Sequence, residues 1–240
     1  MIDLTRHAAV VTGGTGNLGH TVVRRMLESG AHVAVAVRDQ AKADALRDEL
    51  GALVGDETDP RLLSVMADPN DAAPMEALVD RALRAWGRID VCCNLAGGFD
   101  SGPATDLAKI GALWDRNVRP VVVATTACLR PMRARGRGRI VSVAALSGLK
   151  GAKGTAAYSM AKGALVRWTE ALAAEVKGEG ITVNCVLPGT IDHPVNRANM
   201  PKADFSTWAT PDEVAAAILF FCSDAASGIT GQALAVTGRA

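Results

Sequence analysis

Seven short apolar runs recur along the chain, and amphipathic segments of helical length separate most of them. Strands that read as unbroken apolar runs are typical of parallel sheets buried on both faces, and alternation with helices predicts crossover units. The pattern therefore predicts an α/β fold, a Rossmann-type doubly wound seven-stranded parallel sheet with helices on both faces. The expected strands are 8–12, 32–37, 62–67, 89–97, 139–145, 181–189 and 233–236, and the expected helices are 18–28, 41–50, 72–85, 107–134, 155–177 and 211–223.

The length and charge of the chain restrict its organisation and its partners. No internal repeat or long Pro/Gly/Ser linker interrupts its 240 residues, so we expect residues 1–240 to form a single domain. The formal net charge of +1 gives no reason to expect nucleic acid or an anionic membrane surface, which favours a small-molecule substrate. The start of the chain runs directly into an apolar strand without a secretory leader, and we expect a cytoplasmic protein.

Cysteines, histidines and one basic run carry no predicted function. The five cysteines are odd in number and show no CxxC spacing, so we interpret them as small buried hydrophobes. The four histidines do not fall at ligand spacings, and no metal is predicted. The basic run 130–140 lacks interleaved aromatic residues, so we interpret it as a solvated helix end.

A glycine-rich turn, TGGTGNLGH (12–20), follows the first expected strand directly and opens the first helix. Gly13, Gly16 and Gly19 allow a tight turn and a close approach of backbone to a pyrophosphate. The helix start, Asn17 and Leu18, would present free N–H groups to the phosphates. Because this turn lies between a strand and a helix, it predicts a dinucleotide site rather than a merely structural turn.

The end of the second expected strand bears on the choice of cofactor. An acid often binds the adenosine ribose at this point of the sheet, but here Val37 is followed by Arg38. A guanidinium can pair with a 2′-phosphate, so we expect NADP in preference to NAD. The alternative is that Arg38 is a surface residue and Asp39 binds the ribose.

A tyrosine and a lysine lie four residues apart in a segment of helical pattern. Tyr158 and Lys162 share one face of the expected helix, so the ammonium can lie near the phenol while it reaches the cofactor ribose. A nearby positive charge stabilises the phenolate and makes the tyrosine a usable general acid. Tyr158 is also the only tyrosine of the chain.

With the glycine-rich turn, NLAG (94–97), Tyr158, Lys162 and PG (188–189) in this order, the sequence resembles the short-chain dehydrogenase/reductase family along nearly its whole length. The resemblance implies an NAD(P)-dependent oxidoreductase. It implies that Asn117 supports the lysine, and that Asp68 binds the adenine. It further implies that Asn94, Ala96 and Gly97 line the cofactor, with Pro188, Gly189, Thr190 and Ile191 beside the nicotinamide. Family members usually form dimers or tetramers, so we expect a homo-oligomer assembled through 107–134, 155–177 and the last strand.

The serine that normally accompanies this tyrosine is missing. In the family it lies thirteen residues before the tyrosine, where this chain has Ala145. Ser142 lies three positions earlier and should face the other side of the strand, whereas Ser147 lies two residues later and is a possible replacement. Loss of a hydroxyl that steadies a growing oxyanion would cost roughly 2–4 kcal/mol in carbonyl reduction.

Alanine at this position is tolerated in one branch that the sequence resembles, the dihydropteridine reductases. Segment 190–208 is similar to a segment of that branch, and 96–102 is similar to its glycine-rich loop, in which Phe99 could stack on a flat heterocycle. The resemblance implies hydride transfer from NADPH to a conjugated cyclic acceptor such as a quinonoid dihydropteridine. The alternatives are a carbonyl reductase, for example of 3-oxoacyl thioesters with Ser147 as the replacement, and a catalytically silent NADP-binding sensor.

Overall fold

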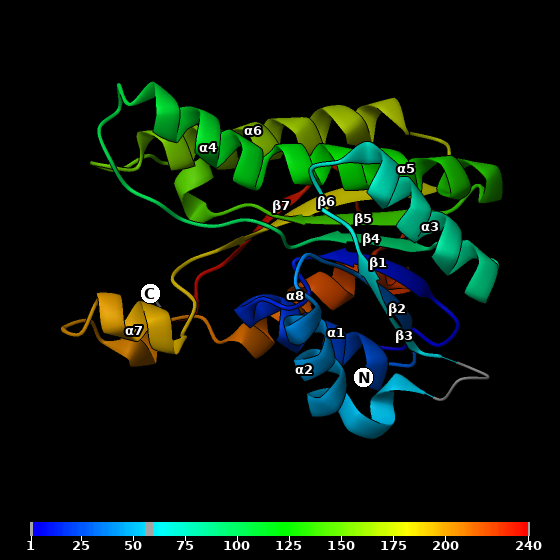
Figure 1. The fold of residues 1–240 in the computed structure, drawn as a ribbon. Coiled ribbons are helices and arrows are strands. Elements are labelled where there is room, and N and C mark those ends of the chain that lie inside the picture. Colours follow the sequence, from blue (N-terminus) through cyan, green and yellow to red (C-terminus); the bar gives the residue numbers. More distant parts are fainter. Residues whose placement is uncertain (1, 56–59, 240) are drawn as a thin grey trace.

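A seven-stranded parallel sheet forms the centre of the computed structural model, which describes residues 2–55 and 60–239 (Figure 1). The strands follow the spatial order β3-β2-β1-β4-β5-β6-β7, so the direction of the connections reverses between β1 and β4. This order and the parallel pairing confirm the predicted doubly wound sheet. The strands are β1 (Ala8–Thr12), β2 (His32–Val37), β3 (Leu62–Met66), β4 (Val91–Asn94), β5 (Gly138–Val143), β6 (Ile181–Pro188) and β7 (Ala233–Val236).

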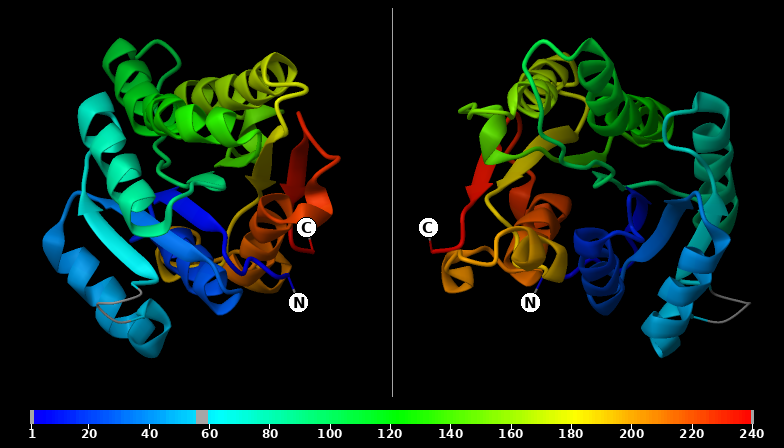
Figure 2. Two further views of the ribbon diagram at one scale, coloured as in Figure 1. Left: turned by 90° about the vertical axis from the view of Figure 1, so that its right-hand side faces the viewer. Right: turned by 60° about the vertical axis from the view of Figure 1, so that its left-hand side comes forward.

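Helices cover both faces of the sheet (Figures 1 and 2). One layer holds α1 (Asn17–Glu28), α2 (Gln40–Leu50) and α8 (Pro211–Cys222), and the other holds α3 (Ala72–Trp86), α4 (Leu107–Asn117), α5 (Arg119–Arg135) and α6 (Ala156–Glu175). A short helix, α7 (Pro194–Asn199), lies away from the sheet near the C-terminus. Single-turn 3₁₀ helices occupy Gly51–Val54, Leu146–Gly148, Phe205–Thr207 and Asp224–Ala226.

The hydrophobic core consists of two layers because successive strand residues point to opposite faces. In β1, Val11 packs into the layer that contains α1 and α8, whereas Val10 packs into the layer that contains α3 and α5. In β4, Cys93 packs into the same layer as Val11, and Cys92 packs into the same layer as Val10. All five cysteines are free thiols and buried, as expected for small core residues. The apolar runs are therefore continuous in sequence because both faces of each strand are covered.

One predicted helix is wrong in its continuity. The segment expected as a single helix over 107–134 divides into α4 and α5 at Val118. Pro120 has no N–H to continue the hydrogen-bond ladder of α4, and the side chain of Asn117 donates to the carbonyl oxygen of Leu113 at 3.0 Å. The division places Asn117 at the C-terminal end of α4.

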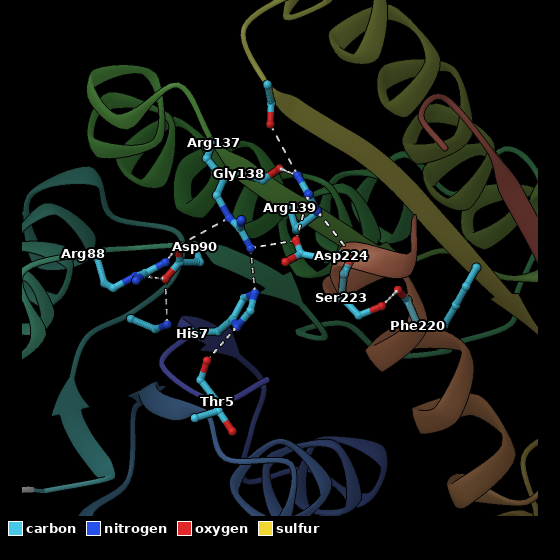
Figure 3. Close-up of polar contacts among 12 residues, drawn as sticks. Thr5, His7, Arg88, Asp90, Arg137, Gly138, Arg139, Phe220, Ser223 and Asp224 are labelled. Atoms are coloured by element: carbon cyan, nitrogen blue, oxygen red, sulfur yellow. Dashed lines mark hydrogen bonds and ion pairs between the residues drawn. The ribbon is translucent and has the colours of Figure 1, made fainter. Parts of the chain in front are cut away.

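A polar cluster lies at the amino ends of β1, β4 and β5, near the start of the last 3₁₀ turn (Figure 3). Asp90 is fully buried and accepts hydrogen bonds from Ala8 N and from the guanidinium of Arg88. Asp224 accepts hydrogen bonds from Arg137 and Arg139. The parallel strands point away from this edge, so the cluster joins elements at the end of the sheet opposite the carboxyl ends that carry the glycine-rich turn.

The basic run 130–140 is largely used in ion pairs within the fold. Arg130 pairs with Asp80, Arg133 with Glu179, and Arg137 with Asp224, each at 2.6 to 2.8 Å. These pairings agree with a helix end and turn rather than a free anion-binding patch. Among the described residues, no helix combines the length and apolarity required to cross a bilayer.

Candidate active site

A cavity of about 1030 Å³ opens at the carboxyl ends of the strands, where the connection reverses between β1 and β4. Open α/β sheets bind ligands in the crevice at such a point. Eight of the predicted cofactor residues line it, namely Gly13, Gly16, Asn17, Leu18, Gly19, Arg38, Ala96 and Gly97. Asp39, the alternative ribose ligand, also lines the cavity. Its remaining lining residues were not predicted from the sequence, and they are Thr15, Ala36, Lys42, Pro69, Asn70, Leu95, Gly98, Asp115, Arg116 and Pro120.

The glycine-rich turn lies at one wall of this cavity and is packed too closely to admit side chains. A Cβ at Gly13 would lie 2.6 Å from the backbone nitrogen of Ala96, and one at Gly19 would overlap the carbonyl oxygen of Gly13. Helix α1 begins at the cavity with Gly16 as its N-cap, no side-chain cap and no acidic residue in its first turn. Its first N–H groups are therefore available to an anion, which fits a pyrophosphate.

Two cations and one acid lie at the end of β2. Arg38 and Lys42 both line the cavity, as does Asp39. The carboxylate of Asp39 is the N-cap of α2 and accepts hydrogen bonds from Ala41 N at 3.0 Å and Lys42 N at 3.4 Å. This end of the cavity thus carries two basic side chains, while the carboxylate of Asp39 accepts hydrogen bonds from the first turn of α2.

Tyr158 and Lys162 lie on the same side of α6, as their spacing predicts. The Nζ atom of Lys162 is 5.8 Å from the centroid of the Tyr158 ring and donates a hydrogen bond to the carbonyl oxygen of Val143 at 2.8 Å. A Cβ at Gly97 would lie 3.3 Å from this Nζ atom. Because Gly97 lines the cavity, the lysine is next to the wall of the cofactor site.

The proton affinities of this pair differ from the expectation. Burial raises the pKa of Tyr158 to about 12, so in this structure the phenol is a weaker acid than the predicted stabilisation of its phenolate by Lys162 would make it. Burial also lowers the pKa of Lys162 to about 8, which a weak interaction with Cys185 opposes. The Nζ atom of Lys162 lies 5.8 Å from the ring centroid and donates its hydrogen bond to Val143, so desolvation of the phenol sets the direction of the Tyr158 pKa shift. The phenol therefore holds its proton at neutral pH, as a proton donor must.

Asn117 connects the end of α4 to the loop that follows β4. Its Nδ2 donates to the carbonyl oxygen of Gly98 at 3.0 Å, and its Oδ1 accepts from Gly98 N at 3.1 Å. A Cβ at Gly97 would lie 2.8 Å from the same Oδ1. Asn117 is fully buried. Through Gly97, it therefore lies close to Lys162, as the resemblance implies.

Asn94, a predicted cofactor residue, directs its side chain into the core. Its Nδ2 donates to Thr125 at 3.0 Å and to Ser142 at 3.2 Å, and the residue is fully buried. The side chain therefore joins β4 to α5 and β5, and the prediction that Asn94 lines the cofactor stays a prediction. Asp68 accepts from Asn70 N at 2.9 Å and shapes the turn whose next two residues line the cavity, so its contact with adenine stays a prediction.

The proline-glycine segment ends β6 and leads into α7. Ala209 N donates to the carbonyl oxygen of Thr190 at 3.1 Å, and Asn196 donates to that of Ile191 at 2.8 Å. Pro188 closes the strand, and Gly189 N donates to the carbonyl oxygen of Val236 in β7. These bonds anchor the segment at the carboxyl edge of the sheet, and its contact with a nicotinamide stays a prediction.

The family model described as short chain dehydrogenase matches residues 7–204 of the sequence. The chain belongs to this family. It is 34% identical over 267 residues to a putative ketoacyl reductase of the monensin polyketide synthase from Streptomyces virginiae, covering 99% of this chain and 98% of the relative. It is 30% identical over 247 residues to the 3-oxoacyl-(acyl-carrier-protein) reductase FabG of Chlamydia muridarum, covering 98% and 97%. This short-chain dehydrogenase is accordingly an oxidoreductase, and a nicotinamide nucleotide is the cofactor of its family.

Solved structures agree with this assignment. A mutant of a short-chain dehydrogenase/reductase from Serratia marcescens is 28% identical and superposes with a TM-score of 0.86 over 98% of each chain. A short-chain dehydrogenase/reductase from Brucella melitensis gives the same identity and TM-score over 99% of this chain and 97% of its own. The features of the cavity fit the dinucleotide: a tight turn at Gly13 and Gly19, a helix start without a side-chain cap and two basic residues.

In this short-chain dehydrogenase, Ala145 occupies the position of the missing serine, and its backbone is extended. Ala145 follows β5 and has 9% of its surface exposed. Ser142 accepts from Asn94 inside the core, so it is separate from the site as predicted. Ser147 has a buried Oγ with no hydrogen-bond partner among the described residues. The 3₁₀ turn that carries Ser147 packs on α6, where a Cβ at Gly148 would lie 2.8 Å from the backbone of Lys162.

One contact near the cavity was missed by the sequence analysis. His193 Nδ1 lies 3.0 Å from Asn17 Nδ2 and also accepts from Val195 N at 3.2 Å. Two N–H donors at one ring nitrogen require its lone pair, so the proton of the neutral ring is on Nε2. This contact joins the glycine-rich turn to the segment before α7. No spacing rule relates residues 176 positions apart, so only the fold reveals it.

Proposed function

We propose that this short-chain dehydrogenase transfers a hydride from NADPH to a conjugated cyclic acceptor such as a quinonoid dihydropteridine. The observation that carries the proposal is Ala145, which offers a methyl group where an acceptor oxygen would need a hydroxyl donor. In a quinonoid acceptor, the hydride enters the ring system and a ring nitrogen takes the proton, so no oxyanion has to be steadied. The resemblance of 190–208 to the dihydropteridine reductases supports the same substrate class.

The residues of the site have separate roles in this proposal. Bound NADPH supplies the hydride. Tyr158 donates the proton, because its phenol, whose pKa burial raises to about 12, is protonated at neutral pH. Lys162 lies between the Tyr158 ring and the wall of the cavity at Gly97, where it can bind the ribose and return a proton toward the phenol. Asn117 holds the loop that carries Gly97 and Gly98.

The test is oxidation of NADPH in the presence of quinonoid dihydropterin. We expect turnover by the wild-type protein, loss of turnover in Tyr158→Phe, and unchanged nucleotide binding in that variant. A wild-type protein that binds NADPH but leaves every conjugated acceptor unreduced would contradict the proposal.

A second candidate is reduction of a 3-oxoacyl thioester. The buried Oγ of Ser147 favours it, because this hydroxyl has no hydrogen-bond partner among the described residues and an acceptor oxygen would supply one. Two relatives that carry the names of ketoacyl reductases point in the same direction. For this candidate, Ser147→Ala should lower ketone reduction about 100-fold and leave reduction of a conjugated acceptor unchanged. Equal activity of Ser147→Ala and wild type on a 3-oxoacyl thioester would exclude it.

NADP is the proposed cofactor rather than NAD. The support is the pair of basic side chains, Arg38 and Lys42, at the end of the cavity where the acid, Asp39, caps helix α2.

We also infer that residues 1–240 act as one domain and that the protein works in the cytoplasm. We infer in addition that it assembles as a dimer or tetramer through α4, α5, α6 and β7. Sedimentation of the purified protein tests the assembly.

A further inference from the structure

A hydrogen bond joins the glycine-rich turn to the segment that leads into α7. His193 Nδ1 lies 3.0 Å from Nδ2 of Asn17, which is the first residue of α1 and lines the cavity. Among the described residues, no other hydrogen bond or ion pair connects 13–19 with 190–208. The side chain of Asn17 is therefore held by a residue from a distant part of the chain, at the point where a pyrophosphate would bind.

The chemistry of His193 fixes the orientation of the Asn17 amide. Val195 N also donates to Nδ1 of His193, at 3.2 Å, so this ring nitrogen is an acceptor. The Asn17 atom beside it has to be the amide nitrogen rather than the amide oxygen, because two acceptors would repel each other. His193 therefore holds the Asn17 side chain by Nδ2 and keeps Oδ1 away from the ring.

His193 is in turn held by its own segment. The guanidinium of Arg197 donates to both carboxylate oxygens of Asp192, at 2.6 and 2.7 Å. Asp192 N donates to the carbonyl oxygen of Ala209 at 2.8 Å, and His193 is the N-cap of α7. The ring is thus a fixed acceptor for Asn17, and its position does not depend on a bound ligand.

The donors nearest to the Asn17 side chain are the first N–H groups of α1. Gly16 gives this helix no side-chain cap, and among the described residues the backbone N–H groups of Asn17, Leu18 and Gly19 have no acceptor. Asparagine is among the strongest capping residues, because its amide oxygen accepts hydrogen bonds from neighbouring backbone N–H groups. A released Asn17 side chain would therefore compete with a pyrophosphate for the same donors.

We propose that His193 is a positioning residue for nucleotide binding and that it acts through Asn17. It holds the Asn17 amide off the start of α1 and leaves the N–H groups of the first turn to the pyrophosphate of the nicotinamide nucleotide. The inference rests on the nucleotide site of the family and stands whichever acceptor the enzyme reduces.

The test is a double-mutant cycle on the affinities for NADP⁺, NAD⁺ and ADP, which share a pyrophosphate, measured by calorimetry. His193→Ser keeps a capping hydroxyl for α7 but is too short to reach Asn17, so all three affinities should fall about three- to tenfold. Asn17→Ala removes the competing amide and should bind within about twofold of wild type. The double variant should also bind like wild type, because without that amide the loss of His193 has no effect.

Two further variants separate this role from general damage to the segment. His193→Asn, whose amide oxygen can replace Nδ1 as the acceptor, should keep the wild-type affinities. Asp204→Ser exchanges the cap of the 3₁₀ turn Phe205–Thr207 in the same segment and is the matched control, which should change none of them. With an acceptor that the wild type reduces, the loss in His193→Ser should appear in the KM for the nucleotide, with kcat kept.

Unchanged affinities in His193→Ser would overturn the inference. A double variant as weak as His193→Ser would also overturn it, because His193 would then act without Asn17. An equal loss in Asn17→Ala would overturn it as well, since the Asn17 side chain would then bind the nucleotide itself. If the cycle gives the expected rescue but no conjugated acceptor is reduced, the proposed function fails and the inference stands.

Discussion

Lys162 donates a hydrogen bond from Nζ to the carbonyl oxygen of Val143 at 2.8 Å, so the last residue of β5 anchors the buried cation of the site. The ammonium has little other compensation for its loss of water, which explains why burial lowers the pKa of Lys162 to about 8. Burial of the Lys162 ammonium therefore lowers the free energy of unfolding, and this loss can be measured.

Lys162→Met should make the protein more stable at pH 7. The pKa of Lys162 is about 8 in the folded chain against 10.5 as the ordinary value, so between these values the unfolded chain binds more protons. The wild-type free energy of unfolding should therefore rise with pH across this window, by roughly 3 kcal/mol at most. The variant should lack this rise in urea unfolding at pH 7, 8.5 and 10. A parallel pH dependence in both proteins would contradict the assignment.

Asn117→Ala should impair activity and stability together. The variant loses both hydrogen bonds to Gly98 and the bond to Leu113, which should cost about 1–3 kcal/mol in the free energy of unfolding. The loop beside Lys162 then loses its anchor, and kcat should fall about 10- to 100-fold. Thr126→Ala, which removes an exposed side chain on α5 bonded to Val122, is the control and should retain kcat. Unchanged kcat in Asn117→Ala would exclude the bracing role.

Arg38→Ala should weaken NADPH binding while NADH binding is kept. A guanidinium that pairs with a 2′-phosphate contributes only to NADPH, so we expect roughly a 10- to 100-fold loss for NADPH alone. Arg47→Ala on the outer face of α2, away from the cavity, is the matched control. If Asp39 binds the ribose instead, Asp39→Ala will reduce NADH affinity and Arg38→Ala will have no effect. Isothermal titration with both nucleotides decides between the two.

Asp90→Asn should strongly destabilise the protein without a direct effect on the site. Burial opposes ionisation of Asp90, but the hydrogen bonds from Arg88 and Ala8 N outweigh it and lower the pKa of this carboxyl (Figure 3). Because the folded pKa is below the ordinary value, its contribution is present above about pH 4 and is lost as the pH falls through the folded pKa.

Removal of this buried partner should cost about 3 kcal/mol or more and flatten the acid limb of the stability profile. Asp80→Asn breaks an exposed pair with Arg130, in which the two side chains are 48% and 65% exposed, and should cost less than about 1 kcal/mol. Similar losses in the two variants would show that burial of Asp90 is unimportant.

Much of the fold was predictable because its signal is local. The continuous apolar runs predicted all seven strands, and β1, β2 and β7 end at the expected residues. The division at Val118 was missed because helical pattern continues on both sides of it, while Pro120 and the side chain of Asn117 interrupt the ladder. At the site, the turn that contains Gly13 and Gly19 was predicted from spacing and lines the cavity as expected.

The sequence by itself determined the sheet, the glycine-rich turn and the helical pairing of Tyr158 with Lys162, since each depends on residues close together in the chain. Only the tertiary structure decided that Asn94 faces the core, that His193 reaches Asn17 and that burial raises the pKa of Tyr158. Those outcomes depend on burial and on contacts between distant segments. Desolvation and packing arise only when the chain is folded, so they leave no local pattern to read.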